Sequence, residues 1–155
     1  MNYLKIFSKK EKENIIEKLK QQFGITKVNG IFVKKGTERL FLFQGNITQK
    51  QIHNLEQIIP IERVGIYFGK FQNSEVRLSI EGVHLLKNQI TKNIFELNKE
   101  QTELWMKGNE LEIQTGKKSF LIMKYKNDFL GCGKASELKI GNFIPKSRRL
   151  KNKTN

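Results

Sequence analysis

The sequence is poor in the residues that many extracellular, disordered and membrane-embedded proteins require. It has one cysteine, Cys132, so no disulfide can form within the chain, which favours a reducing compartment. Only two prolines and 12 glycines occur among 155 residues, which excludes collagen-like and Pro/Gly-rich disordered architectures. No apolar run approaches the ~18 residues that a membrane span needs. The first residues lack the apolar core of a secretory signal, so we expect a cytoplasmic protein with no membrane partner.

Residues typical of enzyme active sites are also scarce. The two histidines, His53 and His84, have no second histidine, cysteine or acid at metal-ligand spacing. Cys132 lies near Lys134, which could activate a thiol, although a lone cysteine is more often a small buried apolar residue. The run GCGKAS lacks the glycine spacing and the hydroxyl residue after lysine that a phosphate-binding loop requires. We therefore expect no enzymatic activity, no metal and no cofactor.

Positive charge is abundant and unevenly distributed. The chain has 29 Lys and Arg against 15 Asp and Glu, a net charge of +14. Lysines outnumber arginines 24 to 5, which could reflect a coding bias, but such a bias would spread evenly. Residues 1–113 carry 18 basic and 13 acidic side chains, whereas residues 114–155 carry 11 and two. This local excess favours a surface that binds a polyanion, with nucleic acid as the first candidate.

Local patterns in the first part of the chain predict helices alternating with short strands. Capping-box spacing and apolar periodicity predict a helix over residues 8–24, which Gly24 ends. Two β-prone runs over residues 30–45 have the pattern of a hairpin. A second capping spacing predicts a helix over 48–60. Residues 63–86 read as a strand, a polar turn, a second strand and a helix.

The last part of the chain reads as a compact, strand-rich unit. A short strand near Ile94 precedes a helix that begins at Asn98 and ends near Gly108. Three further β-prone runs follow, at residues 111–114, 119–125 and 129–133. We see no low-complexity linker between the two parts, so we expect them to pack against each other.

The basic residues of this unit are candidates for phosphate contacts. They lie among small and turn-forming residues, and they are Lys134, Lys139, Lys146, Arg148 and Arg149. Arginine can hold a phosphate with two parallel hydrogen bonds, while lysine acts as a point charge. The alternative for each is a solvated surface charge. Phe129 and Phe143 could stack on bases, although aromatic residues near strands more often belong to the core.

The same text resembles a known RNA-binding domain. The segments WMKGNELEI and FLGCGKASELKIGNFIPKSRRL resemble the PUA-like domain at the end of the Sun-type RNA cytosine-5 methyltransferases. The matching motifs fall on Trp105 to Gly108, Leu130 to Lys134 and Lys139 to Arg149, with Gly141 as a departure from the family pattern. The resemblance implies RNA binding through the basic residues named above, with Gly131 and Gly133 allowing a close approach of the backbone.

The resemblance extends upstream and implies a domain organisation. The segment ERVGIYFGKFQNSEVRLSIEGVHLL is similar to the stretch before the PUA domain in those methyltransferases, and to that of small two-domain PUA proteins that assist 60S-type ribosome assembly. It implies an α+β fold in which a small α/β amino-terminal domain, 1–92, packs on a PUA-like β-barrel, 93–150. Residues 151–155 are expected to form a basic tail.

The resemblance favours one function and leaves an alternative. The large catalytic domain of the methyltransferases cannot fit into 155 residues. We therefore expect a non-catalytic protein that binds rRNA or tRNA and acts in rRNA maturation or modification, alongside an RNA methyltransferase or a ribosome-assembly protein. The alternative is an RNA-recruiting subunit of a split cytosine-5 methyltransferase.

Overall fold

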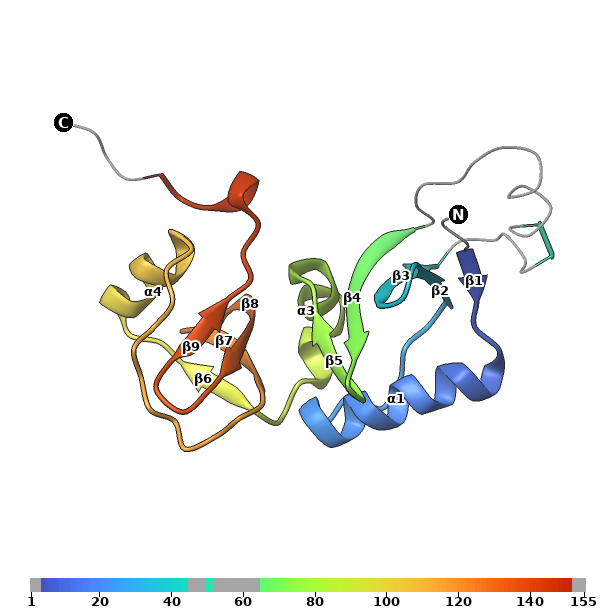
Figure 1. Cartoon of the computed structure of the whole chain (residues 1–155), viewed down its shortest axis with the longest axis horizontal. Coiled ribbons are helices and arrows are strands. Elements are labelled where there is room, and N and C mark those ends of the chain that lie inside the picture. The colour runs from blue at the N-terminus through green and yellow to red at the C-terminus, as the bar shows by residue number, and fades with distance from the viewer. Residues whose placement is uncertain (1–3, 45–49, 52–64, 152–155) are drawn as a thin grey trace.

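The strands form two open sheets that lie side by side. The computed structural model describes residues 4–44, 50–51 and 65–151 (Figure 1). A five-stranded antiparallel sheet has the order β1-β2-β3-β4-β5, and a four-stranded sheet has the order β6-β7-β8-β9, in which only the β6–β7 pair is parallel. Neither sheet closes on itself in the described part of the chain. The fold is thus mixed α and β, and the expected barrel is not seen in it.

The elements follow the chain with short connections. The strands are β1 (Leu4–Ile6), β2 (Ile31–Lys35), β3 (Arg39–Phe43), β4 (Ile66–Gln72), β5 (Glu75–Leu78), β6 (Ile94–Glu96), β7 (Phe120–Tyr125), β8 (Asp128–Ala135) and β9 (Ile140–Asn142). The helices are α1 (Lys9–Phe23), α3 (Ile80–Leu86) and α4 (Lys99–Met106), with short 3-10 turns η1 (Lys87–Gln89) and η2 (Lys146–Arg148).

Helix α1 forms where the capping pattern predicts it. The Ser8 side chain accepts a hydrogen bond from the Glu11 backbone N–H, and the Glu11 carboxylate accepts one from the Ser8 N–H. Gly24 ends the helix with a φ of 80°, a conformation that glycine adopts without steric cost. The buried side chains of α1 pack against one face of the five-stranded sheet. The helix predicted over 8–24 is therefore confirmed.

The two predicted hairpins of the first sheet are also confirmed. Strands β2 and β3 pair in register from Ile31 opposite Phe43 to Lys35 opposite Arg39. The β4–β5 turn contains Asn73 at φ 53° and Ser74 at φ 61°. Two successive positive φ angles match the twist of an antiparallel hairpin, which explains why the polar turn residues occur here.

Strand β7 connects the interiors of the two sheets. All four residues from Phe120 to Met123 are buried, at 4% exposure or less. Phe120 and Ile122 join the core formed with α1 and the first sheet, whereas Leu121 and Met123 join a second core around Trp105. Successive side chains of a strand point to opposite faces, so β7 lies between two packed layers. The expectation that the two parts pack together is confirmed.

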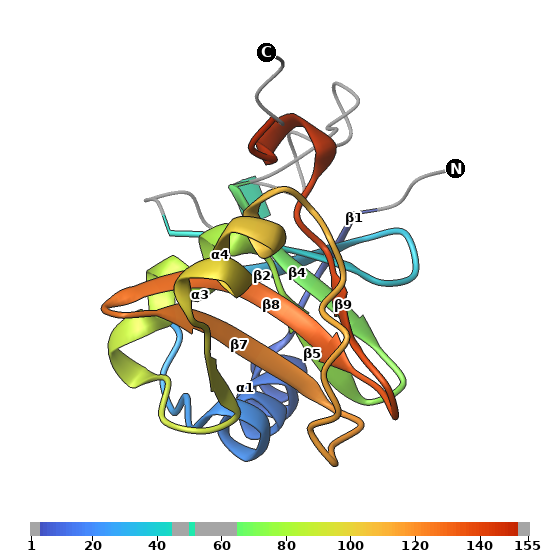
Figure 2. The same ribbon diagram turned by 90° about the vertical axis from the view of Figure 1, so that its left-hand side faces the viewer.

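Helix α4 covers the outer face of the second sheet, away from the first (Figure 2). Asn98 and Gln101 form the predicted capping box. Trp105 is fully buried, and its indole Nε1 donates a hydrogen bond to the Leu130 carbonyl oxygen at 3.1 Å. This contact fixes α4 on strand β8.

Some expectations fail or lie outside the described residues. Residues 111–114 do not form the predicted strand, because only Leu111 makes a bridge, to Ile140. The helix predicted over 48–60 lies outside the described residues except at positions 50 and 51. No helix within the described ranges combines the length and apolar character needed to cross a membrane.

Candidate nucleic-acid interface

Lys134 lies on β8 where the two sheets meet. Its ammonium group forms an ion pair with the Glu75 carboxylate of β5 at 3.1 Å and lies 4.4 Å from the centroid of the Phe120 ring. About a third of the lysine and glutamate side chains remains exposed. Lys134 thus stabilises the junction of the two sheets and keeps a charge that solvent can reach.

Arg148 makes a second ion pair across the same junction. It lies in η2 and contacts the carboxylate of Glu81, in the first turn of α3. Both side chains are about half exposed. A phosphate that binds Arg148 would therefore have to compete with Glu81.

Arg149 and Lys146 differ in how firmly they are held. The Arg149 Nε donates to the Ile144 carbonyl oxygen at 2.9 Å, and its side chain fills the space that a Cβ on Gly108 would occupy. Lys146 is exposed, and it forms no ion pair with any residue that the structure describes. Of the two, Lys146 is the more available to a ligand.

Lys139 lies in the β8–β9 turn and has a different partner. Its ammonium group lies 2.6 Å from the carboxylate of Glu110, and this hydrogen bond raises the pKa of Lys139 above its ordinary value. Lys134, Lys139 and Arg148 are therefore paired with carboxylates from three separate segments. The structure does not gather the five predicted cations around one point.

The two predicted glycines are buried. A Cβ on Gly133 would lie 2.7 Å from the Trp105 ring, and a Cβ on Gly131 would lie 3.3 Å from Ile80. Gly131 also has a φ of 96°. The absence of a side chain at both positions therefore serves internal packing, and their role toward RNA stays a prediction.

Cys132 and the two phenylalanines have distinct surroundings. Burial raises the pKa of the Cys132 thiol to about 12, so the thiol stays protonated and behaves as a small apolar group. Phe129 is half-buried and packs against the shared core. Phe143 is 38% exposed, and the Arg77 guanidinium lies 4.2 Å from its ring centroid. Phe143 is thus the more accessible ring.

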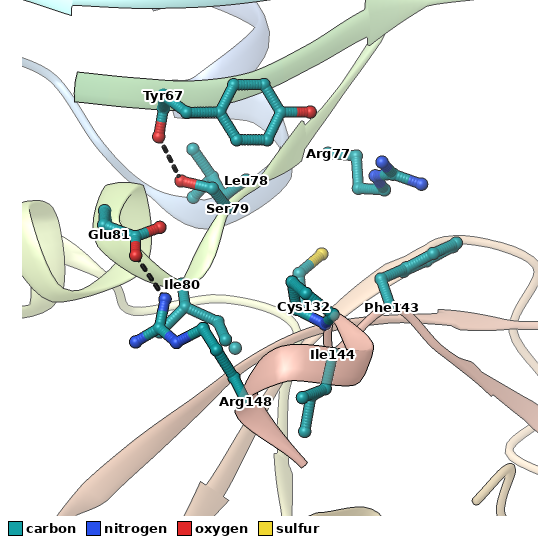
Figure 3. A pocket seen from close by; sticks show the side chains of 12 residues that line it. Tyr67, Arg77, Leu78, Ser79, Ile80, Glu81, Cys132, Phe143, Ile144 and Arg148 are labelled. Carbon is teal, nitrogen blue, oxygen red and sulfur yellow. Dashed lines mark hydrogen bonds and ion pairs between the residues drawn. The ribbon is translucent and has the colours of Figure 1, made fainter. Parts of the chain in front are cut away.

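A pocket lies between the first sheet and the segment after β9. Its volume is about 70 Å³, and its walls include Tyr67, Arg77, Ile80, Phe143 and Arg148 (Figure 3). A second hollow shares Tyr67 and Arg148 with it. The candidate interface therefore combines residues from both parts of the chain.

Arg77 and the carboxylates Glu75 and Glu81 were not predicted as site residues. All three lie in the segment before α3 or in its first turn, far in sequence from the basic cluster. An arginine on a short β-prone strand carries no local signal of its own. Only the packing of β5 against the second sheet shows its place in the interface.

No three histidine, cysteine or acidic residues gather at metal-binding distance within residues 4–44, 50–51 and 65–151. His84 lies on α3, where its Nε2 is 3.0 Å from the Phe129 carbonyl oxygen. His53 lies outside the described residues. The absence of enzymatic activity stays a prediction.

The carboxy-terminal part of this interface has a known counterpart. The chain is a PUA-domain protein, and a PUA domain indicates RNA binding. Residues 92–150 match the family model described as the methyltransferase RsmF PUA domain, which confirms the resemblance to the PUA region of the Sun-type methyltransferases. No curated protein matches the chain.

Proposed function

We propose that this chain is a non-catalytic RNA-binding protein that acts in rRNA maturation or modification in the cytoplasm. The observation that carries the proposal is the match of residues 92–150 to the PUA domain of an RNA methyltransferase. The charge distribution supports it, because residues 114–155 carry 11 basic and two acidic side chains. Residues 1–92 and 93–150 act as two domains in this proposal, the second with the barrel-like form of PUA domains and residues 151–155 as a basic tail.

Lys146 and Arg148 are the most accessible of the proposed RNA contacts. Both are exposed and lie in η2 beside the pocket between the two sheets. Lys134 lies at the same junction, while Arg149 holds the segment after β9 in place. RNA phosphates would displace the Glu81 carboxylate from Arg148 and add a contact to Lys146.

Binding to a labelled rRNA fragment and to duplex DNA, measured by fluorescence anisotropy from about 50 to 200 mM salt, tests the proposal. We expect the wild-type protein to prefer RNA. The K146Q/R148Q variant should bind RNA more weakly, with a salt slope shallower by about 1.4 to 1.8 for the two lost contacts. Arg149 is kept because its side chain supports the fold.

The matched control is K9Q/K10Q, which removes the same charge from the exposed first turn of α1. Equal binding of RNA and DNA would overturn the proposal. Equal losses in K146Q/R148Q and K9Q/K10Q would show that total charge, not η2, determines the affinity.

The description of the matching family favours a second candidate, an RNA-recruiting subunit of a split methyltransferase. This candidate predicts a stable complex with a separately encoded catalytic chain, and faster methylation of the RNA when both chains are mixed. A catalytic chain that methylates at the same rate with and without this protein would exclude it.

A further inference from the structure

One face of the five-stranded sheet carries three cations on adjacent strands. Arg39 of β3 lies directly opposite Lys70 of β4, and Lys70 lies directly opposite Arg77 of β5. Directly opposed residues of antiparallel strands share one face, with Cβ atoms about 4.5–5.5 Å apart. We refer to Arg39, Lys70 and Arg77 as the cation row. Lys35, opposite Arg39 on β2, is buried and is not included.

The cation row is electrostatically unfavourable by itself. Like charges that lie directly opposite each other destabilise a sheet. Neither Arg39 nor Lys70 forms an ion pair with a carboxylate among the described residues, although Arg39 is exposed and Lys70 half-exposed. This repulsion would be relieved by a bound polyanion.

The nearest carboxylates of the two hairpin turns have other partners. Glu75 forms its ion pair with Lys134. Glu38 accepts a hydrogen bond at 3.0 Å from the Gln72 amide when that amide is in its hydrogen-bonding orientation. Neither carboxylate is paired with a cation of the row.

The cation row is continuous with the PUA region. The Arg77 guanidinium stacks on Phe143, 4.2 Å from the ring centroid, and Figure 3 shows Arg77 and Phe143 extending toward each other across the junction. The Phe143 and Phe120 ring centroids are 6.2 Å apart, and Phe120 in turn contacts Lys134. A line of contacts therefore leads from the row to a predicted RNA contact.

We propose that the cation row binds the phosphate backbone of the same RNA that the PUA region contacts. The inference rests on the proposed function and extends the binding surface to the amino-terminal sheet. Adjacent strands are about 4.8 Å apart, so the three cations span about 10 Å and can contact successive phosphates. Such contacts set affinity and register and carry no base specificity.

The test compares two variants that each lower the net charge of +14 by two. R39Q/K70Q neutralises the two unpaired members of the row, while K9Q/K10Q makes the same change on α1, which packs on the opposite face of the sheet. Arg77 is left in place because it contacts Phe143. We expect R39Q/K70Q to bind the rRNA fragment roughly tenfold more weakly at about 0.1 M salt, with a salt slope shallower by about 1.4 to 1.8.

Thermal unfolding followed by circular dichroism checks that R39Q/K70Q keeps its fold. Relief of the cross-strand repulsion should leave its stability equal to or above that of the wild type. If R39Q/K70Q binds like K9Q/K10Q while K146Q/R148Q is weakened, the cation row is not part of the interface and the proposed function stands. If the wild type does not prefer RNA, the proposed function fails and the row fails with it.

Discussion

The two sheets hold their surface cations in different ways. In the four-stranded sheet and the turns around it, Lys134, Lys139 and Arg148 each pair with a carboxylate. In the five-stranded sheet, Arg39 and Lys70 oppose each other with no carboxylate pairing to either in the described part of the chain. The region with the highest charge density in the sequence is therefore not the region with the most available charge. A surface cation can support the fold, bind a ligand or do both.

The first way to break this comparison is to ask whether the two sheets stay packed together. Cys132 faces the core that both sheets share, and burial raises the pKa of its thiol to about 12. At pH 8 the thiolate fraction should be about a thousandfold or more below that of the unfolded chain, whose thiol pKa is about 8.5. The rate of reaction with a small thiol reagent, measured with and without urea, checks this expectation.

The pH dependence of this reaction gives an independent check. Because the raised pKa keeps the native thiol protonated, its reaction rate should still rise with pH at pH 10, whereas the unfolded chain should have levelled off. Rapid reaction in native buffer at pH 8 would mean that the sheets separate readily and that the contacts between them contribute little.

The second prediction concerns the core that belongs to the four-stranded sheet alone. Trp105→Ala removes a fully buried ring packed against Gly133 and Ile140, so the free energy of unfolding should fall by about 3–5 kcal/mol. Leu104→Ala, at a neighbouring position that is 47% exposed, should change it by about 0.5 kcal/mol or less. Denaturant unfolding followed by circular dichroism measures both, because Trp105 is the only tryptophan.

The shape of the Trp105→Ala transition sharpens the comparison further. Since β7 contributes Phe120 and Ile122 to the shared core, we expect one cooperative transition for both sheets. Two separated transitions would show that the five-stranded sheet keeps its fold without the PUA region, and each sheet would then be a separate unit of stability.

The sequence predicts the elements that local signals define and misses those that distant pairing creates. The capping boxes at Ser8 and Asn98 lie within one helical turn, so both helices were predicted correctly. The three-residue strands β1 and β9 have too little pattern of their own, and they exist because they pair with β2 and β8. The strand predicted over 111–114 fails because Leu111 alone meets a partner.

The same distinction applies to the candidate site. Charge density identifies Lys134 and Arg148 as candidates, but their carboxylate partners lie 59 and 67 residues away in the sequence. The cation row depends on cross-strand register, which no local pattern of Arg39 or Lys70 reveals. Pairing at a distance, and not residue type, decides which cations are available.

The last and smallest effect tests whether paired cations are available to RNA. Glu75→Gln combined with Glu81→Gln removes the carboxylates that hold Lys134 and Arg148 and keeps side chains of similar size. Half-exposed ion pairs contribute about 0–1 kcal/mol each, so RNA phosphates that no longer compete with them should bind about two- to fivefold more tightly. For the same reason the stability should fall by at most about 1–2 kcal/mol.

The matched control is E13Q/E103Q, which changes the net charge equally at two exposed helical positions without an ion pair among the described residues. Anisotropy titrations with the rRNA fragment compare the two variants. A larger gain in E75Q/E81Q would show that Lys134 and Arg148 exchange carboxylate for phosphate when RNA binds. Equal gains would mean that these two cations serve the junction between the sheets, and RNA contacts would then rest on Lys146 and the cation row.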